Sequence, residues 1–291
     1  MSCFVAMPGN EAMARALAQA TGGSWLRAEV RRFPDRESHV RLSEPVEGLK
    51  VVVVCTLDDP DPKTVPLILA AGAARDNGAA CVGLVAPYLA YLRQDAVFGT
   101  GEPLSARHYG RLLAGVFDSL ITVDPHLHRI DRIGDIFPGP VVAVQAAPLL
   151  ADWVLANVQR PVVIGPDAES RQWVAEVAER AGAPWTLMEK QRLGDETVRL
   201  RLPDLSEYRG RTPILVDDII STGVTLTQAA MELRRLGFAP PVCLAVHALF
   251  AAEAAWSSLR AAASRVVTTD TVPHPSNGVS IGRAIAEALR G

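Results

Sequence analysis

Short runs of apolar, mostly β-branched residues recur along the chain, and longer Ala- and Leu-rich segments separate them. Runs that are apolar almost throughout are typical of strands buried on both faces of a parallel sheet. These runs predict strands at residues 51–55, 81–85, 120–123, 162–164, 214–216, 242–246 and 266–268. The segments between them predict helices at residues 11–21, 63–77, 106–116, 147–157, 170–181, 226–236 and 251–261.

This alternation predicts an α/β fold, in which each domain is a mainly parallel sheet flanked by helices. The pattern runs twice, over residues 1–145 and again over residues 146–273, so we expect two tandem domains. Residues 277–289 predict one more helix at the end of the chain. Residues 190–210 are rich in charge and predict either a β-ribbon or a mobile loop, since long polar insertions beside a sheet often act as lids.

Composition narrows the class of protein. The 291 residues carry a formal net charge of -3, so no general attraction draws the chain to nucleic acid or to an anionic membrane. No apolar stretch reaches the roughly 18 residues that span a bilayer, and the first residues lack the pattern of a secretory signal. The four cysteines form no C-x-x-C pair, which favours reduced thiols over a metal or redox site. We expect a cytoplasmic protein.

The segment from Ile214 to Leu226, ILVDDIISTGVTL, carries the strongest chemical signal. A short apolar strand ends in two adjacent carboxylates, Asp217 and Asp218, which repel each other unless they face hydroxyls or a divalent cation. A Ser-Thr-Gly turn and a helix follow, so hydroxyls, backbone N–H groups and the helix dipole converge on one point. The carboxylates can bind a diol, and the neighbouring turn can bind an anion. Together they predict a site for a phosphorylated ribose.

A plainer interpretation is an acidic helix entry in which Ser221 or Thr222 caps the helix. The full combination is more specific than a cap. It resembles the ribose-phosphate binding signature of type I phosphoribosyltransferases and of ribose-phosphate pyrophosphokinases (PRPP synthetases), and alone it does not choose between them. The resemblance implies a ribose 5-phosphate site formed by Asp217, Asp218, Ser221, Thr222, Gly223, Val224 and Thr225.

Further segments resemble the pyrophosphokinases in particular, in matching order along nearly the whole chain. Residues 33–38, FPDRES, resemble the family's FPDGE adenine-binding loop, where an aromatic ring can stack on adenine and carboxylates can accept from its amine. Residues 91–95, YLRQD, resemble its ARQD segment, whose arginine can pair with ATP phosphates. Taken singly, the two segments also fit an ordinary turn and a solvated loop. The implied ATP-binding residues are Phe33, Asp35, Glu37, Arg93, Gln94, Asp95 and His126.

The metal side of the resemblance rests on two loops that follow predicted strands. Residues 124–126, DPH, match a family triplet whose histidine lies beside metal-bound ATP, which implies His126. Its pairing with His128 leaves zinc as an alternative. Residues 165–170, GPDAES, resemble the family's SPDAGG loop, whose aspartate contributes to ribose-phosphate and metal binding, which implies Asp167.

Residues 189–193, EKQRL, resemble the start of the catalytic loop in one branch of the family. The chain has only three lysines, so a lysine here indicates a need for a compact charge, although a surface lysine is the plain alternative. The resemblance implies Lys190 and Arg192 as catalytic residues.

The activity implied by the resemblance is that of a ribose-phosphate diphosphokinase. It transfers the β,γ-diphosphoryl group of Mg-ATP to the C1 hydroxyl of ribose 5-phosphate, giving 5-phosphoribosyl 1-diphosphate and AMP. Residues 1–145 would then be the ATP-side domain, with residues 274–291 packed back on it, and residues 146–273 the ribose 5-phosphate-binding domain, both phosphoribosyltransferase-like. The family also implies a homo-oligomer, based on dimers and often a hexamer, in which residues 33–37 complete a neighbour's site.

The chain departs from the family pattern at several positions, which are Arg36 and Val224 in place of glycine, Ser221 in place of a frequent aspartate, Ala96-Val97-Phe98 in place of basic residues, and Glu169-Ser170 in place of Gly-Gly. No G-x-x-x-x-G-K-[ST] motif is present, which excludes a P-loop kinase. Two alternatives stay open: a noncatalytic, nucleotide-binding regulatory relative, and a phosphoribosyltransferase that acts on a base.

Overall fold

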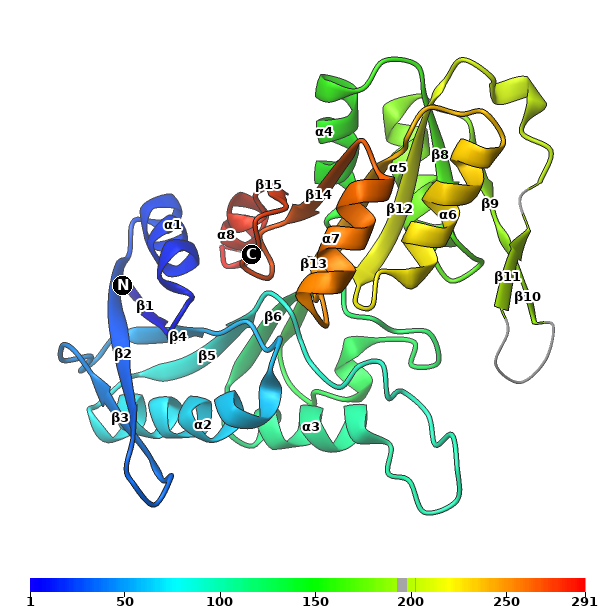
Figure 1. Cartoon of the computed structure of the whole chain (residues 1–291). Helices are drawn as coiled ribbons and strands as arrows, with labels where there is room; N and C mark the ends of the chain where they lie inside the picture. Colours follow the sequence, from blue (N-terminus) through cyan, green and yellow to red (C-terminus); the bar gives the residue numbers. More distant parts are fainter. Residues whose placement is uncertain (193–197, 202, 291) are drawn as a thin grey trace. The chain divides into compact units, whose positions relative to one another are not determined.

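The chain folds into two compact units in the computed structural model, which describes residues 1–192, 198–201 and 203–290 (Figure 1). The first unit consists of Met1–Val144 together with Gly282–Gly291, and the second is Gln145–Ile281. Each unit has its own sheet with helices on both faces. No helix in the described ranges is long and apolar enough to cross a membrane.

The first unit is built on a seven-stranded sheet in the order β3-β2-β1-β4-β5-β6-β7. Its strands are β1 (Ser2–Ala6), β2 (Ser24–Arg32), β3 (Ser38–Leu42), β4 (Lys50–Val54), β5 (Cys81–Ala86), β6 (Ser119–Val123) and β7 (Val141–Val144). Strands β2 and β3 pair antiparallel as a hairpin, and all other neighbours pair in parallel. Residues 51–54 of β4 are at most 2% exposed, as expected for a strand covered on both faces.

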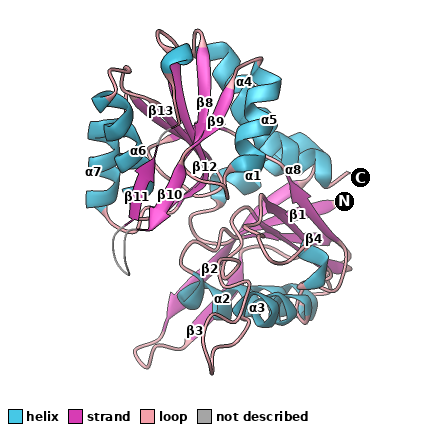
Figure 2. Ribbon diagram, turned by 90° about the vertical axis from the view of Figure 1, so that its right-hand side faces the viewer, coloured by secondary structure: helices cyan, strands magenta, loops and turns pink. Residues whose placement is uncertain are grey.

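Four helices cover this sheet. Helices α1 (Glu11–Thr21) and α8 (Gly282–Ala288) lie on one face, and α2 (Pro60–Asp76) and α3 (Ser105–Ala114) lie on the other (Figures 1 and 2). A single turn, η1 (Ile133–Asp135), precedes β7. Helix α8 packs against α1 and β7, so the last residues of the chain complete the first unit.

The second unit contains a six-stranded, fully parallel sheet in the order β15-β14-β13-β12-β8-β9. Its strands are β8 (Pro161–Gly165), β9 (Trp185–Leu187), β12 (Thr212–Ile220), β13 (Val242–Ala248), β14 (Arg265–Thr269) and β15 (Asn277–Val279). Helices α4 (Ala147–Asn157) and α5 (Arg171–Ala181) cover one face, and α6 (Val224–Arg235) and α7 (Glu253–Ala262) cover the other (Figure 2). Buried apolar side chains of α6 and α7 form one core with residues of β12 and β13.

The charged stretch between β9 and β12 contains an antiparallel ribbon. Strand β10 (Glu189–Arg192) pairs with β11 (Val198–Arg201), and a single turn, η2 (Ser206–Tyr208), follows. Of the two structures predicted for this stretch, the β-ribbon is therefore confirmed for the described residues. Residues 193–197 and 202, which join and follow the two strands, lie outside them.

The predicted helix over residues 277–289 is wrong in its first part. Asn277–Val279 form β15, and α8 begins only at Gly282. The Asn277 side-chain amide donates to Thr268 Oγ1 at 3.0 Å and to the Thr269 carbonyl at 2.6 Å, and these bonds hold the segment against β14. Asn277 therefore favours pairing with the sheet over helix formation.

All four cysteines are free thiols. Cys3, Cys55 and Cys243 are buried and Cys81 is partly buried. Burial raises the pKa of Cys55 and of Cys243 to about 12, so both are protonated and unreactive at neutral pH.

Candidate functional site

Three carboxylates lie together at one edge of the second sheet. Strands β8 and β12 are parallel neighbours that pair Ile164 with Leu215, so the segments beyond these residues emerge at the same edge. Asp167 follows β8, and Asp217 lies in β12. Burial, and then the charges of Asp218 and Asp167, raise the pKa of Asp217 well above its usual range. The structure therefore brings Asp167 close to Asp217, as the proposed metal and sugar site requires.

The sequence predicted that Asp217 and Asp218 follow a strand, but both residues lie inside one. Strand β12 continues to Ile220 and pairs Asp217 with Ala245 of β13. Asp218 is 5% exposed and Asp217 is partly buried, and the Asp218 N–H donates to Asp217 Oδ1 at 3.0 Å. Closely spaced carboxylate oxygens are the donor set that Mg²⁺ and Ca²⁺ prefer, so these aspartates fit a hard cation.

The loop after β8 is shaped by Asp167. Its Oδ1 accepts the N–H groups of Glu169, at 2.9 Å, and of Ser170, at 3.3 Å, and its carbonyl accepts Ser170 Oγ at 2.8 Å. Ser170 is buried while Glu169 is exposed. The departure from Gly-Gly is thus accommodated by one residue packed inside the loop and one that points its charge toward solvent.

The turn before α6 is open at the start of the helix. Gly223 is the N-cap residue, with φ +68°, and no side chain caps the helix. Neither Ser221 nor Thr222 therefore plays the capping role of the plainer interpretation. The N–H groups of the first helical turn have no acceptor within the helix, and together with the helix dipole they favour an anion.

Gly223 and Val224 fit this turn for different reasons. A Cβ at position 223 would lie 3.3 Å from the Ala255 carbonyl oxygen, and positive φ also favours glycine. Val224, the first residue of α6, is 54% exposed, so the replacement of a glycine by valine is accommodated at the surface. Ser221 is held by its carbonyl, which accepts the Ala251 N–H at 3.1 Å.

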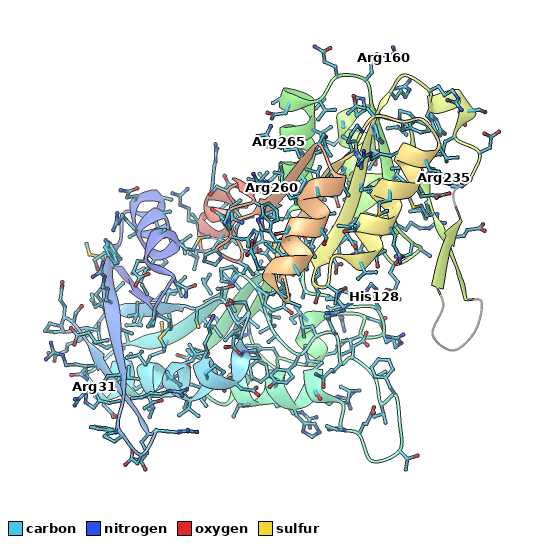
Figure 3. The ribbon with its side chains drawn as sticks, viewed as in Figure 1. Arg31, His128, Arg160, Arg235, Arg260 and Arg265 are labelled. Carbon is cyan, nitrogen blue, oxygen red and sulfur yellow. The ribbon has the colours of Figure 1, made fainter. Side chains whose placement is uncertain are left out.

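In the first unit, residues 33–37 form the exposed tip of the β2–β3 hairpin. The Phe33 N–H donates to the Glu37 carbonyl at 2.9 Å, and the Glu37 N–H donates to Asp35 Oδ1 at 3.1 Å. Arg36 has φ +75°, a conformation that glycine adopts at less cost, which explains why the related loops carry glycine there. The Phe33 ring is 39% exposed and lies 4.8 Å from the guanidinium carbon of Arg31, which Figure 3 labels.

The segment that contains Arg93 and Gln94 is anchored just before them. Tyr91 has φ +64°, its hydroxyl donates to Asp61 of α2, and its ring lies 4.6 Å from that of Tyr109 in α3. A non-glycine residue in this region is strained, and such strain often marks functional segments. Arg93 and Gln94 are exposed, as ligand-binding side chains must be.

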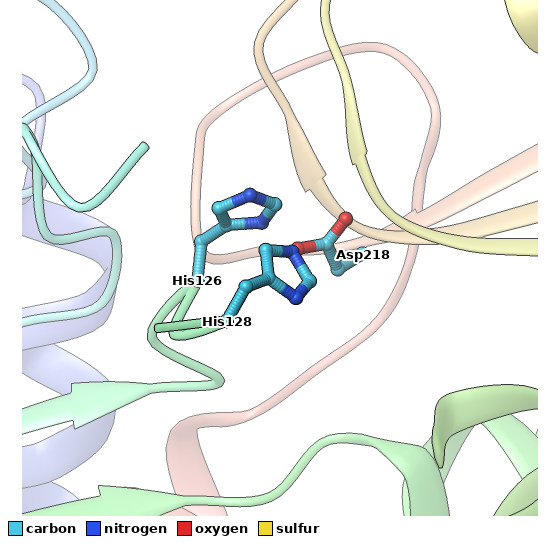
Figure 4. A group of neighbouring side chains, drawn as sticks. All are labelled: His126, His128 and Asp218. Atoms are coloured by element: carbon cyan, nitrogen blue, oxygen red, sulfur yellow. The ribbon is translucent and has the colours of Figure 1, made fainter. Parts of the chain in front are cut away.

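Asp95 faces the opposite way and is buried. Its carboxylate accepts the N–H groups of His128, at 3.3 Å, and of Arg129, at 2.9 Å, in the loop after β6. That loop carries His126 and His128, whose rings meet edge to face with centroids 4.1 Å apart (Figure 4). The structure thus joins the YLRQD segment to the histidine loop through Asp95.

Two predicted residues cannot be placed by side chain. Lys190 and Arg192 belong to β10, where they pair with Leu200 and Val198 of β11. Their side chains lie outside the described part of the chain, so their catalytic roles stay predictions.

Comparison with known proteins decides the family. Residues 2–116 match the model of the N-terminal domain of ribose phosphate pyrophosphokinase, and residues 135–284 match the phosphoribosyl transferase domain. The ribose-phosphate pyrophosphokinase of Methanopyrus kandleri is 37% identical, covering 95% of this chain and 94% of its own. This chain belongs to the ribose-phosphate pyrophosphokinase family.

Other members agree over most of their length. The ribose-phosphate pyrophosphokinase of Thermococcus kodakarensis is 34% identical, over 89% of this chain and 91% of its own. The crystal structure of phosphoribosylpyrophosphate synthetase from Mycobacterium smegmatis superposes with a TM-score of 0.86 at 26% identity, covering 99% of this chain and 97% of that one. The expected fold, two phosphoribosyltransferase-like α/β domains, is confirmed.

Within this pyrophosphokinase, the candidate residues fall into three groups. Residues 167, 217–218 and 221–225 gather at one edge of the second sheet. Residues 93–95 and 126–129 gather in the first unit. The hairpin tip, residues 33–37, lies at the β3 side of the first sheet, with β1 and β4 between it and β5. Arg129 could not be predicted from the sequence, because no local motif marks it.

Proposed function

We propose that this pyrophosphokinase transfers the β,γ-diphosphoryl group of ATP to the C1 hydroxyl of ribose 5-phosphate, with AMP as the leaving group. The observation that carries the proposal is the grouping of Asp167, Asp217 and Asp218 beside the uncapped start of α6 in a chain that matches the family over nearly its whole length. Carboxylates can accept hydrogen bonds from the hydroxyls of a ribose, while the N–H groups of the turn donate to its 5-phosphate.

The residues would divide the work as follows. Ser221, Thr222, Gly223 and Thr225 hold the 5-phosphate through hydroxyls and N–H groups, with Val224 contributing its N–H. Asp217 and Asp218 orient the ribose diol. Arg93, Gln94 and the hairpin tip bind the nucleotide. Lys190 and Arg192 stabilise the negative charge that develops on the transferring group. Such transfer depends on positioning and charge neutralisation more than on covalent chemistry.

We propose Mg²⁺ as the cation, held by Asp167 with the neighbouring aspartates and, on the nucleotide side, by His126. When bound, Mg²⁺ neutralises the charge of the polyphosphate oxygens. The carboxylate set suits it well, whereas imidazole is a less usual ligand, so the role of His126 rests on the family resemblance alone.

A direct assay tests the proposed reaction. We expect the purified protein, incubated with ribose 5-phosphate and Mg-ATP, to release AMP and 5-phosphoribosyl 1-diphosphate in equal amounts, as quantified by chromatography. Lys190→Ala should lose roughly 10³-fold in rate, the scale of removing one transition-state cation.

The same assay separates the alternatives. A noncatalytic relative would bind ATP in calorimetry yet release no AMP. A phosphoribosyltransferase would consume 5-phosphoribosyl 1-diphosphate only when a base is added. Either result, or a fully active Lys190→Ala variant, would contradict the proposal in a distinct way.

We further propose that the active enzyme is a homo-oligomer in which the hairpin tip serves a neighbouring subunit. Residues 31–37 are exposed, and Phe33 offers an uncovered aromatic face. The hairpin lies at the β3 side of the sheet, away from the strands β5 and β6 that carry the other nucleotide-side segments. The size of the oligomer and the cytoplasmic location stay predictions from the sequence.

A further inference from the structure

Arg129 lies in the histidine loop, and its side chain bonds to the YLRQD segment. Its guanidinium Nη1 lies 3.0 Å from Asp95 Oδ1. The Asp95 side chain is 2% exposed, whereas the Arg129 side chain is 53% exposed. The ion pair is therefore buried on the carboxylate side and open to solvent on the guanidinium side.

Asp95 fixes the backbone of Arg129 as well as its side chain. The other carboxylate oxygen, Oδ2, accepts the Arg129 N–H at 2.9 Å and the His128 N–H at 3.3 Å. Burial raises the pKa of Asp95, but the hydrogen bonds from Arg129 and His128 outweigh burial and hold it below its usual range. Asp95 is thus ionised at neutral pH and is committed to this loop.

The guanidinium of Arg129 also contacts an aromatic ring. The guanidinium carbon of Arg129 lies 5.2 Å from the ring centroid of Phe98, which is itself 61% exposed. Stacking on an aromatic ring suits the flat guanidinium and would not suit a lysine in the same way. Asp95 and Phe98 together therefore hold one planar cation at a defined place, with part of its surface in solvent.

The placement of this cation suggests its use. Of the five N–H donors of a guanidinium, the bond to Asp95 uses one, and those on the exposed part can bind a ligand. Arg93 and Gln94 immediately precede Asp95, and residues 96–98 bring no positive charge of their own. An immobilised fork of this kind binds phosphate oxygens with little loss of side-chain entropy.

We propose that Arg129 binds the phosphate chain of ATP, and that Asp95 is its positioning residue and not itself a nucleotide ligand. The inference rests on the proposed function, since it assigns a further residue to the same nucleotide. It replaces the expectation that Asp95 contacts ATP directly.

Steady-state kinetics of the full-length enzyme tests this assignment. We expect Arg129→Gln to raise the KM for ATP about tenfold, the scale of one lost charge-assisted hydrogen bond, with the KM for ribose 5-phosphate unchanged. The melting temperature should fall somewhat, because the buried carboxylate of Asp95 loses one of its partners. The KM for ATP of Arg129→Lys should lie between those of the wild type and Arg129→Gln, because lysine keeps the charge but not the forked guanidinium. Asp95→Asn should raise the KM for ATP similarly, and the double variant should be no worse than either single one, because the two residues act as a unit.

Arg132→Gln is the matched control. Arg132 lies in the same loop and is more exposed, and its partner, Asp135, is three residues away. The variant removes the same charge, so its KM for ATP should stay within twofold of the wild type. A general effect of positive charge would instead shift both variants equally and would overturn the proposal.

Other outcomes are equally decisive. An unchanged KM for ATP in Arg129→Gln, with the wild type active, would overturn this inference and leave the proposed function intact. An inactive wild type would instead count against the proposed function. If Asp95→Asn fails to fold, Phe98→Leu serves in its place, with an expected two- to fivefold rise in KM for ATP from the lost ring face.

Discussion

Asp217 shows how a single residue of this site can lower the stability of the folded protein. Its carboxylate is partly buried and faces Asp218 and Asp167, so its pKa is raised. Because the folded-state pKa lies above the unfolded one, ionisation disfavours the folded state. The penalty is absent below the unfolded pKa, grows as the pH rises between the two values and is complete above the folded value. A cation or a sugar diol would relieve it.

We therefore expect Asp217→Asn to stabilise the metal-free protein while abolishing its activity. At neutral pH, the melting temperature should rise by about 2–4 °C, which corresponds to about 1 kcal/mol. The gain should shrink as the pH falls and should vanish below about 4, where the wild-type carboxyl is protonated in both states. Tryptophan fluorescence is a suitable probe, because only Trp25 lies outside the second unit.

The control for this measurement is Glu179→Gln. Glu179 is an exposed residue of α5 in the same unit, so its variant removes one negative charge without touching the acidic cluster. Its melting temperature should follow that of the wild type at every pH. A destabilised Asp217→Asn protein at neutral pH would show that the carboxylates are not in conflict.

Local segments could reveal the acidic cluster but not the partner of Asp95. Asp217, Asp218 and the turn at residues 221–225 follow one another along the chain, so their chemistry was predictable. Asp95 and Arg129 are separated by 34 residues, and only the fold brings them together. The family resemblance placed Asp95 among the ATP-binding residues. The sequence could not show the bonds that Asp95 makes within the protein.

At the scale of elements, the β2–β3 hairpin stands apart from the rest of its sheet. It is antiparallel in an otherwise parallel sheet and ends in an exposed tip. Charged residues on both strands, such as Glu29 and Arg41, which form an ion pair, suit an exposed edge. The hairpin thus presents residues 33–37 outward, as a shared site would require.

Subunit complementation tests whether the hairpin works in a neighbour's site. A double variant, Phe33→Ala with Glu37→Ala, and the Lys190→Ala variant should each be inactive. When the two variants are mixed and allowed to exchange subunits, we expect about a quarter of the wild-type activity to return. About half of the pairs are then mixed, and each mixed pair contains one intact site and one defective site. A mixture that stays inactive despite demonstrated exchange would place the hairpin in the site of its own chain.

The apolar runs predicted most of the central strands, but they missed β1 and the peripheral strands. Strands buried on both faces, such as β4 and β13, consist of apolar residues that stand out in any window. Strand β2 alternates between buried and exposed positions and is rich in charge, and β15 has only three residues. Such peripheral strands take their conformation from a neighbouring strand, and the sequence of the segment alone does not contain that neighbour.

At the scale of the whole molecule, the second unit is inserted into the first. The chain leaves the first unit after Val144 and returns to it at Gly282. Its last helix, α8, packs against α1 near the start of the chain, and Ile285 and Leu17 are both fully buried. The first unit is therefore complete only after residues 282–290, which follow the second unit in the chain, have been made.

A substitution at the end of the chain should consequently weaken its beginning. We expect Ile285→Ala to lower the free energy of unfolding of the first unit by roughly 2–4 kcal/mol, the usual cost of truncating a buried aliphatic side chain. Hydrogen exchange should accelerate in α1 and β1, while the core strands of the second unit keep their protection.

Glu287→Ala provides the comparison. Glu287 lies in the same helix, is exposed, and pairs only with Arg283 in the described contacts, an ion pair of little energetic weight. Its exchange pattern should match the wild type. Equal acceleration in both units for Ile285→Ala would show that they unfold as one.

The start of α6 has a consequence for the enzyme in the cell. With glycine at the N-cap and no side chain bonded to the first turn, the N–H groups at this helix start would be completed by the proposed sugar phosphate. A ligand present at a hundredfold above its Kd adds about 2.7 kcal/mol to the stability of the protein that binds it. Supply of the sugar phosphate would thus affect how long each molecule survives proteolysis as well as how fast it works, so that abundance would follow substrate supply without any separate control.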